Sequence, residues 1–398
     1  VLYGIENPVF KDLKRDRVFI FKKLLPWLPR FIFTVRKINR MNMPVEDYLK
    51  TVVKNPSLRD MISQHFFKNT PTFFALSYFS LYIDYFYPKG GVGKLSDALK
   101  NKITEFGGEL KPETKIIEVQ SDNKLVIDQN NLRYKNDNLI WATDLQTLYK
   151  ITSTEGLTPE NKLKFEETKS SMLQSRGTDS VFSLFLEVDE PLESFRKIAH
   201  GHFFYTPSII GLGETHREEL NKLLSDFGNV KKEEILAWLD KFTKLNTYEI
   251  SIPGLKDPEL VPPGQTGMII SFLAEYDLFN EIRKAGWLDE FTVEIENRMI
   301  NVLSDSVYPM LKDKIIARFS FTPLNIENRV GSSEGAIVGW SFQKKMPVVN
   351  KIQISDRSVF TPIPSIYQAG QWAYSPAGVP MSILTGKLAA DQVLKNKT

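Results

Sequence analysis

The stretch SIYQAGQWAYSPAGVPMSILTGKLAADQVL, residues 365–394, joins a short apolar strand pattern, a turn rich in glycine and proline, and a helical pattern. Gly370 closes the predicted strand, and a glycine there lets the backbone approach a ligand that a side chain would hold away. Gly378, Val379 and Pro380 lead into the predicted helix, whose first N–H groups have no partner within the helix. The stretch therefore predicts a strand–turn–helix unit with a partly positive helix end.

A second glycine-containing run, KGGVGK at residues 89–94, is similar to the deviant phosphate-binding loop of ParA-type and MinD-type ATPases. Such a loop needs a hydroxyl for magnesium directly after the lysine. Leu95 stands at that position, and Ser96 comes one residue too late. We therefore favour a tight turn that begins a helix, and we keep the ATPase as a remote alternative.

Hydrophobic periodicity predicts the elements around these two stretches. A helix is expected at 94–106, stopped by Gly107 and Gly108. We expect strands within 114–120, 124–129, 137–143, 179–188, 247–253 and 266–276, and further helices at 215–226, 231–245, 288–312 and about 381–395. The first 80 residues have a helical and aromatic pattern broken by prolines.

Composition excludes several classes of site. The chain has 398 residues, enough for two or more domains, with 42% hydrophobic and 25% charged residues. It has no cysteine, which excludes disulfides, thiolate metal sites and cysteine nucleophiles. A net charge of +3 gives no reason to expect nucleic acid, and no apolar run is long enough to predict a membrane span. The chain begins with Val1 and has no signal-peptide pattern, which suggests a fragment or a processed product.

Histidine is scarce, so a metal site would need carboxylates. The four histidines are His65, His200, His202 and His216. His200 and His202 have the spacing of two ligands on one strand face, but no third ligand is evident. We interpret them as part of a loop or a strand edge, and we predict no metal.

Three separated motifs, taken together, resemble one family. They are YPKGGVGKLSDALKNKITEFGGELKPETKIIEV at 87–119, PLNIENRVGSSEGAIVGW at 323–340, and the stretch at 365–394. In this order they resemble the phytoene desaturase, carotenoid isomerase and retinol saturase family of flavoproteins, which is related to amine oxidases. The resemblance implies an α/β fold: a two-domain FAD/NAD(P)-binding, Rossmann-like flavoprotein with a mixed α+β substrate domain and a helical lid.

The resemblance also implies a division of the chain. Residues 1–85 would form the lid part of the substrate domain, and residues 86–150 part of the FAD domain. Residues 151–345 would form the substrate domain, and residues 346–398 the C-terminal part of the FAD domain. The family's G-x-G-x-x-G turn and its acidic partner have no counterpart before residue 80. We therefore expect that the N-terminal dinucleotide-binding βαβ unit is missing from this chain, which would weaken its own hold on FAD.

The cofactor residues follow from the same resemblance. Gly370, Gln371, Gly378, Val379, Pro380 and Met381 match the family's C-terminal flavin signature. The helix end, with Pro380 in its first turn and the Met381 N–H as a donor, would favour the negative charge of a reduced flavin. Gln371 stands where the family often has an acidic residue, and its amide can still bond a ribityl hydroxyl. Val119 matches the position whose backbone contacts adenine; a plain core valine is the alternative.

Residues 11–40 suggest a membrane surface, because ten Lys or Arg stand there against two Asp, with large apolar residues between them. A solvated helical lid is the alternative, and nucleic acid is not expected. Aromatic residues that could line an apolar tunnel follow, with ordinary core packing as the alternative: Phe73, Phe74, Tyr78, Phe79, Tyr82, Tyr85 and Phe86. Glu327, Arg329 and Glu334 are candidate site residues because they lie in a family-like segment, with an ordinary ion pair as the alternative.

The resulting hypothesis is an FAD-dependent oxidoreductase that acts on an apolar polyene or related lipid through hydride transfer at the flavin. Desaturation, saturation and isomerisation all remain open, no catalytic residue is named, and the pattern specifies no oligomeric state. We expect a cytoplasmic protein with peripheral membrane contact as an option. The alternative is a lipid-binding or interaction fragment without catalysis.

Overall fold

The structure is a computed structural model that describes residues 16–81, 86–213, 215–342 and 345–396. The chain divides into two compact units. The first comprises Val1–Lys54 and Asn69–Tyr85, and the second comprises Asn55–Lys68 and Phe86–Thr398. Each unit is described below by itself, and the four-part division expected from the family resemblance stays a prediction.

The first unit is helical, as its sequence pattern predicts. Its elements are α1 (Arg17–Phe19), a π-helical segment (Ile20–Leu24), α2 (Leu25–Arg40), α3 (Val45–Val52) and α5 (Thr72–Leu81). The Val45 N–H donates to the Thr70 carbonyl, and the Thr72 N–H donates to the Met43 carbonyl. These bonds bring the starts of α3 and α5 together, and Val45, Leu49 and Ala75 are buried there.

The second unit contains a five-stranded antiparallel sheet in the order β10-β6-β9-β8-β7. Its strands are β6 (Ser180–Val188), β7 (His202–Tyr205), β8 (Tyr248–Ser251), β9 (Thr266–Ala274) and β10 (Ile315–Phe321). In β6 and β9 every second residue is buried, which is the alternation that the sequence predicts.

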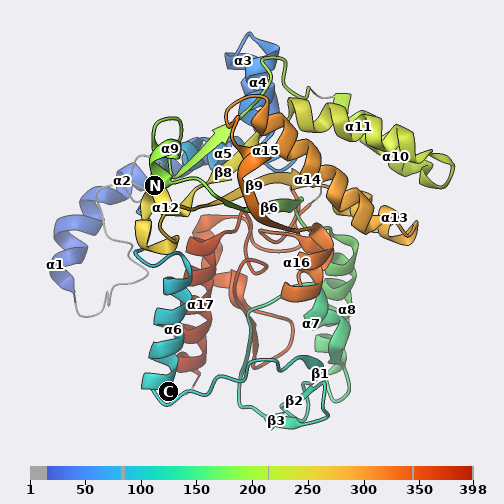
Figure 1. The fold of residues 1–398 in the computed structure, drawn as a ribbon. Coiled ribbons are helices and arrows are strands. Elements are labelled where there is room, and N and C mark those ends of the chain that lie inside the picture. Colours follow the sequence, from blue (N-terminus) through green and yellow to red (C-terminus); the bar gives the residue numbers. More distant parts are fainter. Residues whose placement is uncertain (1–15, 82–85, 214, 343–344, 397–398) are drawn as a thin grey trace. The chain divides into compact units, whose positions relative to one another are not determined.

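One face of this sheet packs on helices. The helices are α10 (Thr215–Ser225), α11 (Lys232–Leu245), α13 (Tyr276–Lys284) and α14 (Leu288–Ser304), and Figure 1 shows α11, α13 and α14 gathered beside the sheet. Phe182, Leu184, Ile270 and Phe272 point from the sheet into this core and are at most 5% exposed. The opposite face of the sheet is not part of this core.

The predicted helix at 288–312 is wrong in its second half. Helix α14 ends at Ser304, and a separate short helix, α15, covers Leu311–Lys314. Between them the fully buried Tyr308 donates its backbone N–H to the Leu303 carbonyl, and Pro309 has no N–H to continue a helix. Burial of the tyrosine ring therefore overrides the helical periodicity of this segment.

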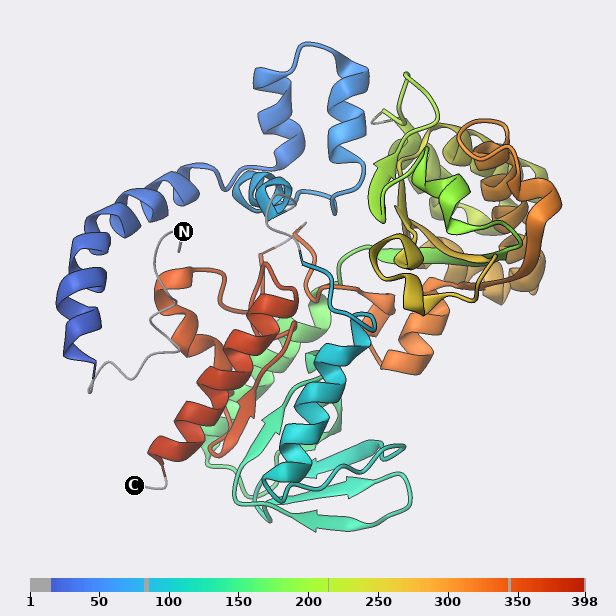
Figure 2. The same cartoon turned by 60° about the vertical axis from the view of Figure 1, so that its left-hand side comes forward.

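Two smaller sheets complete the second unit. One has the order β3-β2-β1-β5, with β1 (Ile116–Gln120), β2 (Leu125–Asp128), β3 (Arg133–Lys135) and β5 (Thr152–Ser153). The other pairs β4 (Leu139–Trp141) with β11 (Ile366–Gln368) in parallel. Figure 2 shows β1, β2 and β3 as a separate small sheet. The polar strand β3 has no apolar alternation and is not predicted from the sequence.

The remaining helices of this unit surround these sheets or connect the strands. They are α4 (Pro56–Ser63), α6 (Gly93–Glu105), α7 (Leu145–Ile151), α8 (Pro159–Gln174), α9 (Leu192–Arg196), α12 (Pro253–Lys256), α16 (Pro323–Val330) and α17 (Val379–Lys395). Short 3₁₀ segments lie at Phe227–Asn229, Pro258–Leu260, Ser333–Gly335 and Ile352–Val359. Within the described residues no helix is both long enough and apolar enough to cross a membrane.

Helix α6 confirms the predicted helix, but it has no buried residue. Its apolar positions Leu95, Leu99 and Ile103 are between 44% and 55% exposed, and Phe106 at its end is 81% exposed. Amphipathic helices in proteins are stabilised mainly by packing of the apolar face. No described part of the chain buries that face of α6.

Candidate functional site

The parallel strands β4 and β11 end side by side, and their ends form the first part of the candidate site. The Ala369 N–H donates to the Trp141 carbonyl at 2.9 Å. Gly370 follows with φ +83°, and a Cβ at this position would lie 3.1 Å from the Ala142 carbonyl oxygen. Ligands of α/β proteins bind beyond the carboxyl ends of parallel strands, so this edge is a suitable place for a cofactor.

Helix α17 is fixed to the end of β11 by Thr385. The fully buried Thr385 hydroxyl accepts the Gly370 N–H at 3.0 Å and donates to the Met381 carbonyl at 2.8 Å. These bonds tie the second turn of α17 to the turn that follows the strand. Sequence reasoning did not identify Thr385, because a threonine inside a helical pattern carries no signal of its own.

The N-terminus of α17 has no side-chain cap. Gly378 is its N-cap residue, with φ +131°, and Pro380 lies in the first turn. The first N–H groups of this 17-residue helix therefore keep their hydrogen-bonding capacity for a ligand. Val379 is 61% exposed at this end, and Met381 is half-buried.

Gln371 lies in the turn between β11 and α17. Its side chain is half-buried and makes no hydrogen bond within the described residues. The turn around it is held by Trp340, whose indole N–H donates to the Trp372 carbonyl at 2.8 Å, and by Gly339, where a Cβ would lie 2.5 Å from the Gln371 carbonyl oxygen. Six of the seven predicted cofactor residues thus lie within one strand–turn–helix unit, and their roles stay predictions.

Val119 lies in a different sheet from these six residues. It belongs to β1, pairs with Val126 on one side and Thr152 on the other, and is 1% exposed. It shares a hydrophobic core with Ile366 and Trp372, so a common core connects the two sheets. The adenine contact expected at Val119 stays a prediction.

A buried carboxylate that the sequence did not single out lies just after β4. Asp144 is 2% exposed and caps α7 by accepting the Thr147 N–H at 2.7 Å. Its second oxygen accepts the Ser333 N–H at 2.9 Å. Asp144 therefore holds the 333–335 turn beside the end of β4, which gives it a positioning role.

The KGGVGK run forms the expected tight turn. Gly90 and Gly91 have φ angles of +82° and +90°. The Gly90 N–H, which a phosphate loop would offer to an anion, donates to the Asp257 carboxylate at 2.7 Å. A carboxylate in this place would repel a phosphate, so the turn gives no support to the ATPase alternative.

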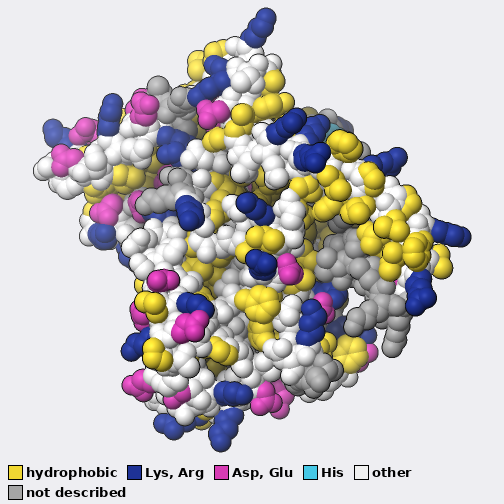
Figure 3. All heavy atoms as spheres, turned by 180° about the vertical axis from the view of Figure 1, so that it is seen from behind, with side chains coloured by type: hydrophobic (Ala, Val, Ile, Leu, Met, Phe, Trp, Pro, Cys, Tyr) yellow, Lys and Arg dark blue, Asp and Glu magenta, His cyan; other side chains and the backbone are white. Residues whose placement is uncertain are grey.

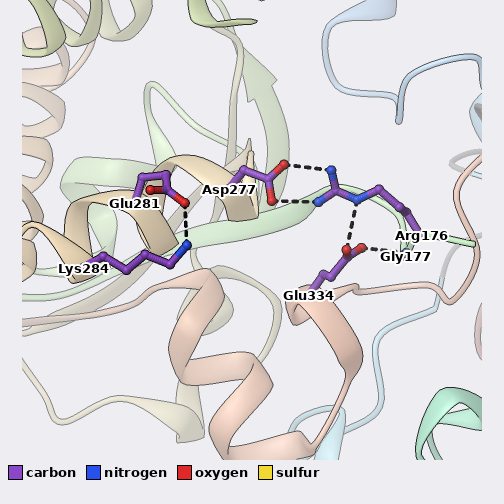
Figure 4. A network of polar contacts seen from close by, with 6 residues as sticks. All are labelled: Arg176, Gly177, Asp277, Glu281, Lys284 and Glu334. Carbon is purple, nitrogen blue, oxygen red and sulfur yellow. Dashed lines mark hydrogen bonds and ion pairs between the residues drawn. The ribbon is translucent and has the colours of Figure 1, made fainter. Parts of the chain in front are cut away.

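The family-like segment at 323–340 contributes an ion-pair network, which Figure 4 shows. Arg176 binds Asp277 through two hydrogen bonds of 2.7 and 2.8 Å and Glu334 through one of 2.9 Å. These bonds raise the pKa of the Arg176 guanidinium above its usual range. Glu334 also accepts the Gly177 N–H at 2.9 Å. The network joins the start of α13 to the two chain segments that run into and out of the five-stranded sheet.

The other two candidates of that segment make separate contacts. Glu327 accepts the Tyr276 hydroxyl at 2.6 Å, and the Arg329 guanidinium lies 5.0 Å from the centre of the Phe321 ring. Burial, followed by the bond to Glu327, raises the pKa of Tyr276 above its usual range. Of the three candidates, only Glu334 makes an ion pair among the described residues, and the site roles expected for all three stay predictions.

The second part of the candidate site is the face of the five-stranded sheet that is not packed on helices, here called the open face. Phe319, Phe185 and Ile269 lie in one cross-strand row, and the Phe185 and Phe319 rings stack with centroids 4.6 Å apart. The Ser183 and Ser271 hydroxyls bond at 2.7 Å in the next row. A cavity of about 260 Å³ opens on the apolar rows and is lined by residues that include Phe185, Ile269, Phe319, Leu260 and Val261.

Two buried titratable groups lie elsewhere in the second unit. Burial lowers the pKa of His65 to about 4, against a smaller opposite effect of Glu249. Burial and the nearby Asp179 carboxylate raise the pKa of Glu275 to about 7, while Arg217 opposes this change. Both groups therefore remain neutral in conditions where they would be charged in water.

The histidine interpretation agrees with the structure. His202 begins β7, an edge strand of the sheet, and His200 lies in the loop before it. The described residues contain no group of three or more His, Asp or Glu that could hold a metal ion. The side chain of His216 lies outside the described residues.

Some of the residues predicted to line an aromatic tunnel lie among the described residues. Phe73, Phe74 and Tyr78 are half-buried in α5, and Phe86 is 91% exposed. The side chain of Phe79 and residues 82–85 lie outside the described residues. The tunnel therefore stays a prediction.

Comparison with known proteins gives a family match and several distant relatives. The family model described as flavin containing amine oxidoreductase matches residues 65–394. The all-trans-retinol 13,14-reductase of Danio rerio is 23% identical, over 96% of this chain and 63% of that protein. The neurosporene-forming phytoene desaturase of Rhodobacter capsulatus is 21% identical, over 96% of this chain and 68% of that protein. The chain thus spans less than two thirds of the length of the retinol reductase.

Solved structures share the fold at low identity. An oxidoreductase from Methanosarcina mazei has a TM-score of 0.55 at 13% identity, over 94% of this chain and 73% of that chain. Putrescine oxidase bound to putrescine has a TM-score of 0.54 at 11% identity, over 90% of this chain and 69% of that chain. The expected α/β flavoprotein fold is confirmed.

Proposed function

The chain belongs to the flavin containing amine oxidoreductase family, and from this premise we propose that it binds FAD and acts as an oxidoreductase on an apolar polyene or related lipid. The observation that carries the cofactor proposal is the uncapped N-terminus of α17 beside Gly370. When bound, FAD supplies the centre that accepts or donates a hydride. The residues of the chain would bind the ring, orient it and exclude water.

Three residues would hold FAD. Gly370 brings the turn after β11 close to the Ala142 carbonyl, at the strand ends where a ring would lie, and the N–H groups after Gly378 would favour a negatively charged ring. The Gln371 amide, which has no other partner within the described residues, would bond a ribityl hydroxyl.

The substrate proposal rests on the open face and on the relatives. The apolar rows and the cavity beside Phe185 offer a surface to an elongated hydrocarbon chain. The two relatives named above carry the names of retinol and phytoene, both polyene compounds. Lipid binding without catalysis is the second candidate, because an apolar surface of this kind can hold a hydrocarbon chain without any cofactor.

One experiment separates the two candidates. The purified protein is titrated with FAD while flavin fluorescence is followed. It is then incubated with all-trans-retinol and chemically reduced FAD, or with phytoene, oxidised FAD and a quinone as electron acceptor, while the polyene absorption spectrum is recorded. Oxidoreductase activity changes the conjugated system only when FAD is present. Binding of the polyenes with no spectral change in the presence of FAD would favour the non-catalytic candidate. Gln371→Leu should weaken FAD binding about tenfold through the lost hydrogen bond, whereas the exposed Gln174→Leu should not.

Membrane contact through the first unit is a separate part of the proposal. The described residues of this segment expose Phe21 and Phe33 by 66% and 69%, and Ile32 by 45%. Basic residues lie among them on the same elements, at Lys22, Lys23, Arg30, Arg36, Lys37 and Arg40. Figure 3 shows apolar side chains next to Lys and Arg at its right-hand edge. Such a surface suits a membrane with anionic lipids, from which an apolar substrate could be taken up.

Vesicle sedimentation tests this contact. The protein should co-sediment with phosphatidylcholine vesicles that contain phosphatidylserine and much less with phosphatidylcholine alone. Lys22→Glu with Lys23→Glu should reduce binding several-fold, since each basic residue near the surface is worth about 1 kcal/mol. Lys162→Glu with Lys164→Glu, on the exposed side of α8, is the matched control. Equal binding to both vesicle types would contradict the electrostatic part of the proposal.

A further inference from the structure

The open face of the five-stranded sheet changes character across the strands. In the row that begins with Phe319, Phe185 and Ile269, the next residues on β8 and β7 are Ser251 and His202. The following row has an aromatic residue at each end and Glu249 beside the last one: Phe321, Ser183, Ser271, Glu249 and Phe204. The half formed by β10, β6 and β9 is therefore mainly apolar, and the half formed by β8 and β7 is mainly polar.

The polar half contains a carboxylate and an imidazole that are hydrogen-bonded to each other. The His202 Nε2 and the Glu249 Oε1 lie 2.7 Å apart. The His202 side chain is 14% exposed and the Glu249 side chain 46% exposed, so the carboxylate remains accessible to a ligand on this face. Besides this side-chain bond to His202, Glu249 pairs through its backbone with Phe204 and Ser271.

Other charged and polar groups surround the pair. The Lys256 stem lies against Gly201, next to His202, since a Cβ at Gly201 would clash with the Lys256 Cγ. Burial lowers the pKa of Lys256, and Glu249 opposes this change. His65 also lies within the electrostatic reach of Glu249 and contacts the Phe204 ring at 4.6 Å between centroids. A carboxylate, two imidazoles and an ammonium group thus gather at one end of an otherwise apolar surface.

The charged and polar groups at this end of the face determine which end group of a ligand can bind there. A carboxylate ligand would be repelled by Glu249 and attracted by Lys256, and an ammonium ligand would meet the reverse, so the two side chains together favour neither charge. A purely hydrocarbon end would cover polar groups without bonding them, which carries a desolvation cost. A neutral hydroxyl fits, because it can donate to a remaining lone pair of the Glu249 carboxylate without bringing a charge to this face.

We infer that the open face binds an amphiphilic substrate, a polyene or isoprenoid chain that ends in a hydroxyl group. The hydroxyl would bond the Glu249–His202 pair, and the chain would cross the sheet over Ile269, Phe185 and Phe319 toward the 260 Å³ cavity. The three strand spacings from β8 to β10 give a path of about 15 Å. This inference rests on the proposed function and narrows its substrate class from apolar polyenes in general to lipid alcohols.

A matched pair of ligands tests the inference without relying on catalysis. All-trans-retinol and the corresponding hydrocarbon without the hydroxyl are titrated into the intact protein while quenching of tryptophan fluorescence is recorded. We expect retinol to bind about tenfold more tightly, as one charge-assisted hydrogen bond would give. Equal affinity, or tighter binding of the hydrocarbon, overturns the hydroxyl site while leaving a polyene-binding protein. Binding of neither ligand overturns both the inference and the proposed function.

Variants then locate the hydroxyl. Glu249→Leu should remove the preference for retinol and leave the affinity for the hydrocarbon unchanged or higher. Glu187→Leu, at the other end of the open face, is the matched control and should change the two affinities by the same factor. A preference for retinol that survives Glu249→Leu in a folded protein, verified by circular dichroism, would show that the hydroxyl binds elsewhere. Should that variant not fold, Glu249→Gln keeps an acceptor oxygen and should retain part of the preference, and full retention would equally count against the site.

Discussion

At the scale of single residues, two glycines of the same C-terminal segment have opposite requirements. Gly370 has φ +83°, and a Cβ added at this position would lie 3.1 Å from the Ala142 carbonyl oxygen. Gly386 lies inside α17 with no atom within 4 Å of a would-be Cβ. The first glycine is required by both backbone conformation and space, and the second by neither.

We predict that Gly370→Ala lowers the free energy of unfolding by about 1–3 kcal/mol, because alanine is strained at this φ and crowds the carbonyl. Gly386→Ala should raise the same free energy by about 0.5–1 kcal/mol, since alanine is the better helix former. Urea denaturation followed by circular dichroism measures both. A stable Gly370→Ala protein would mean that the turn after β11 can relax, and would remove the stated reason for glycine there.

At the scale of elements, α6 is an amphipathic helix with an exposed apolar face. We predict that Leu99→Gln changes the free energy of unfolding by less than about 0.5 kcal/mol, as an exposed substitution should. The matched Leu239→Gln in α11, where the leucine is 1% exposed, should cost about 3 kcal/mol or more, because it buries an amide in the core. Thermal or urea unfolding compares the two. A large loss for Leu99→Gln would indicate that the α6 face is covered in the folded protein.

At the scale of the whole molecule, two buried groups make opposite contributions to the pH dependence of stability. His65 has its pKa lowered from 6.5 to about 4. Below pH 6.5 His65 binds a proton in the unfolded chain but stays neutral in the native state, so acidification toward pH 4 lowers the free energy of unfolding. Glu275 has its pKa raised from 4.5 to about 7. Between these pH values the native state keeps a proton that the unfolded chain releases, so stability falls as the pH rises.

We therefore predict a flattened stability profile in the range where the two windows overlap, pH 4.5 to 6.5. Glu275→Gln should make stability rise with pH across this range, by at most about 3 kcal/mol in total, since each shifted pKa unit is worth about 1.4 kcal/mol. His65→Gln should give the opposite slope. Urea midpoints at several pH values measure the profiles. Slopes that are the same in wild type and both variants would show that neither group titrates as described.

Much of the fold could be predicted from local sequence. The alternation of β6 and β9, the helix that begins after the KGGVGK run, and the strand–turn–helix around Gly370 all confirm their predicted types. Each depends on the spacing of apolar residues and on the backbone preferences of glycine and proline within one short segment. The polar strand β3 was missed because its pairing with β2, and not an apolar pattern, forms it. The end of α14 at Ser304 was predicted wrongly because burial of Tyr308 ends the helix there.

Six cofactor candidates could be predicted from local sequence, because these residues lie within twelve positions of one another. The tertiary structure alone decided three pairings: Thr385 with Gly370, Arg176 with Glu334, and His202 with Glu249. The last two join residues 158 and 47 positions apart. No local pattern encodes such a meeting, since the register of the antiparallel strands and the packing of helices on the sheet set which distant side chains come within bonding distance.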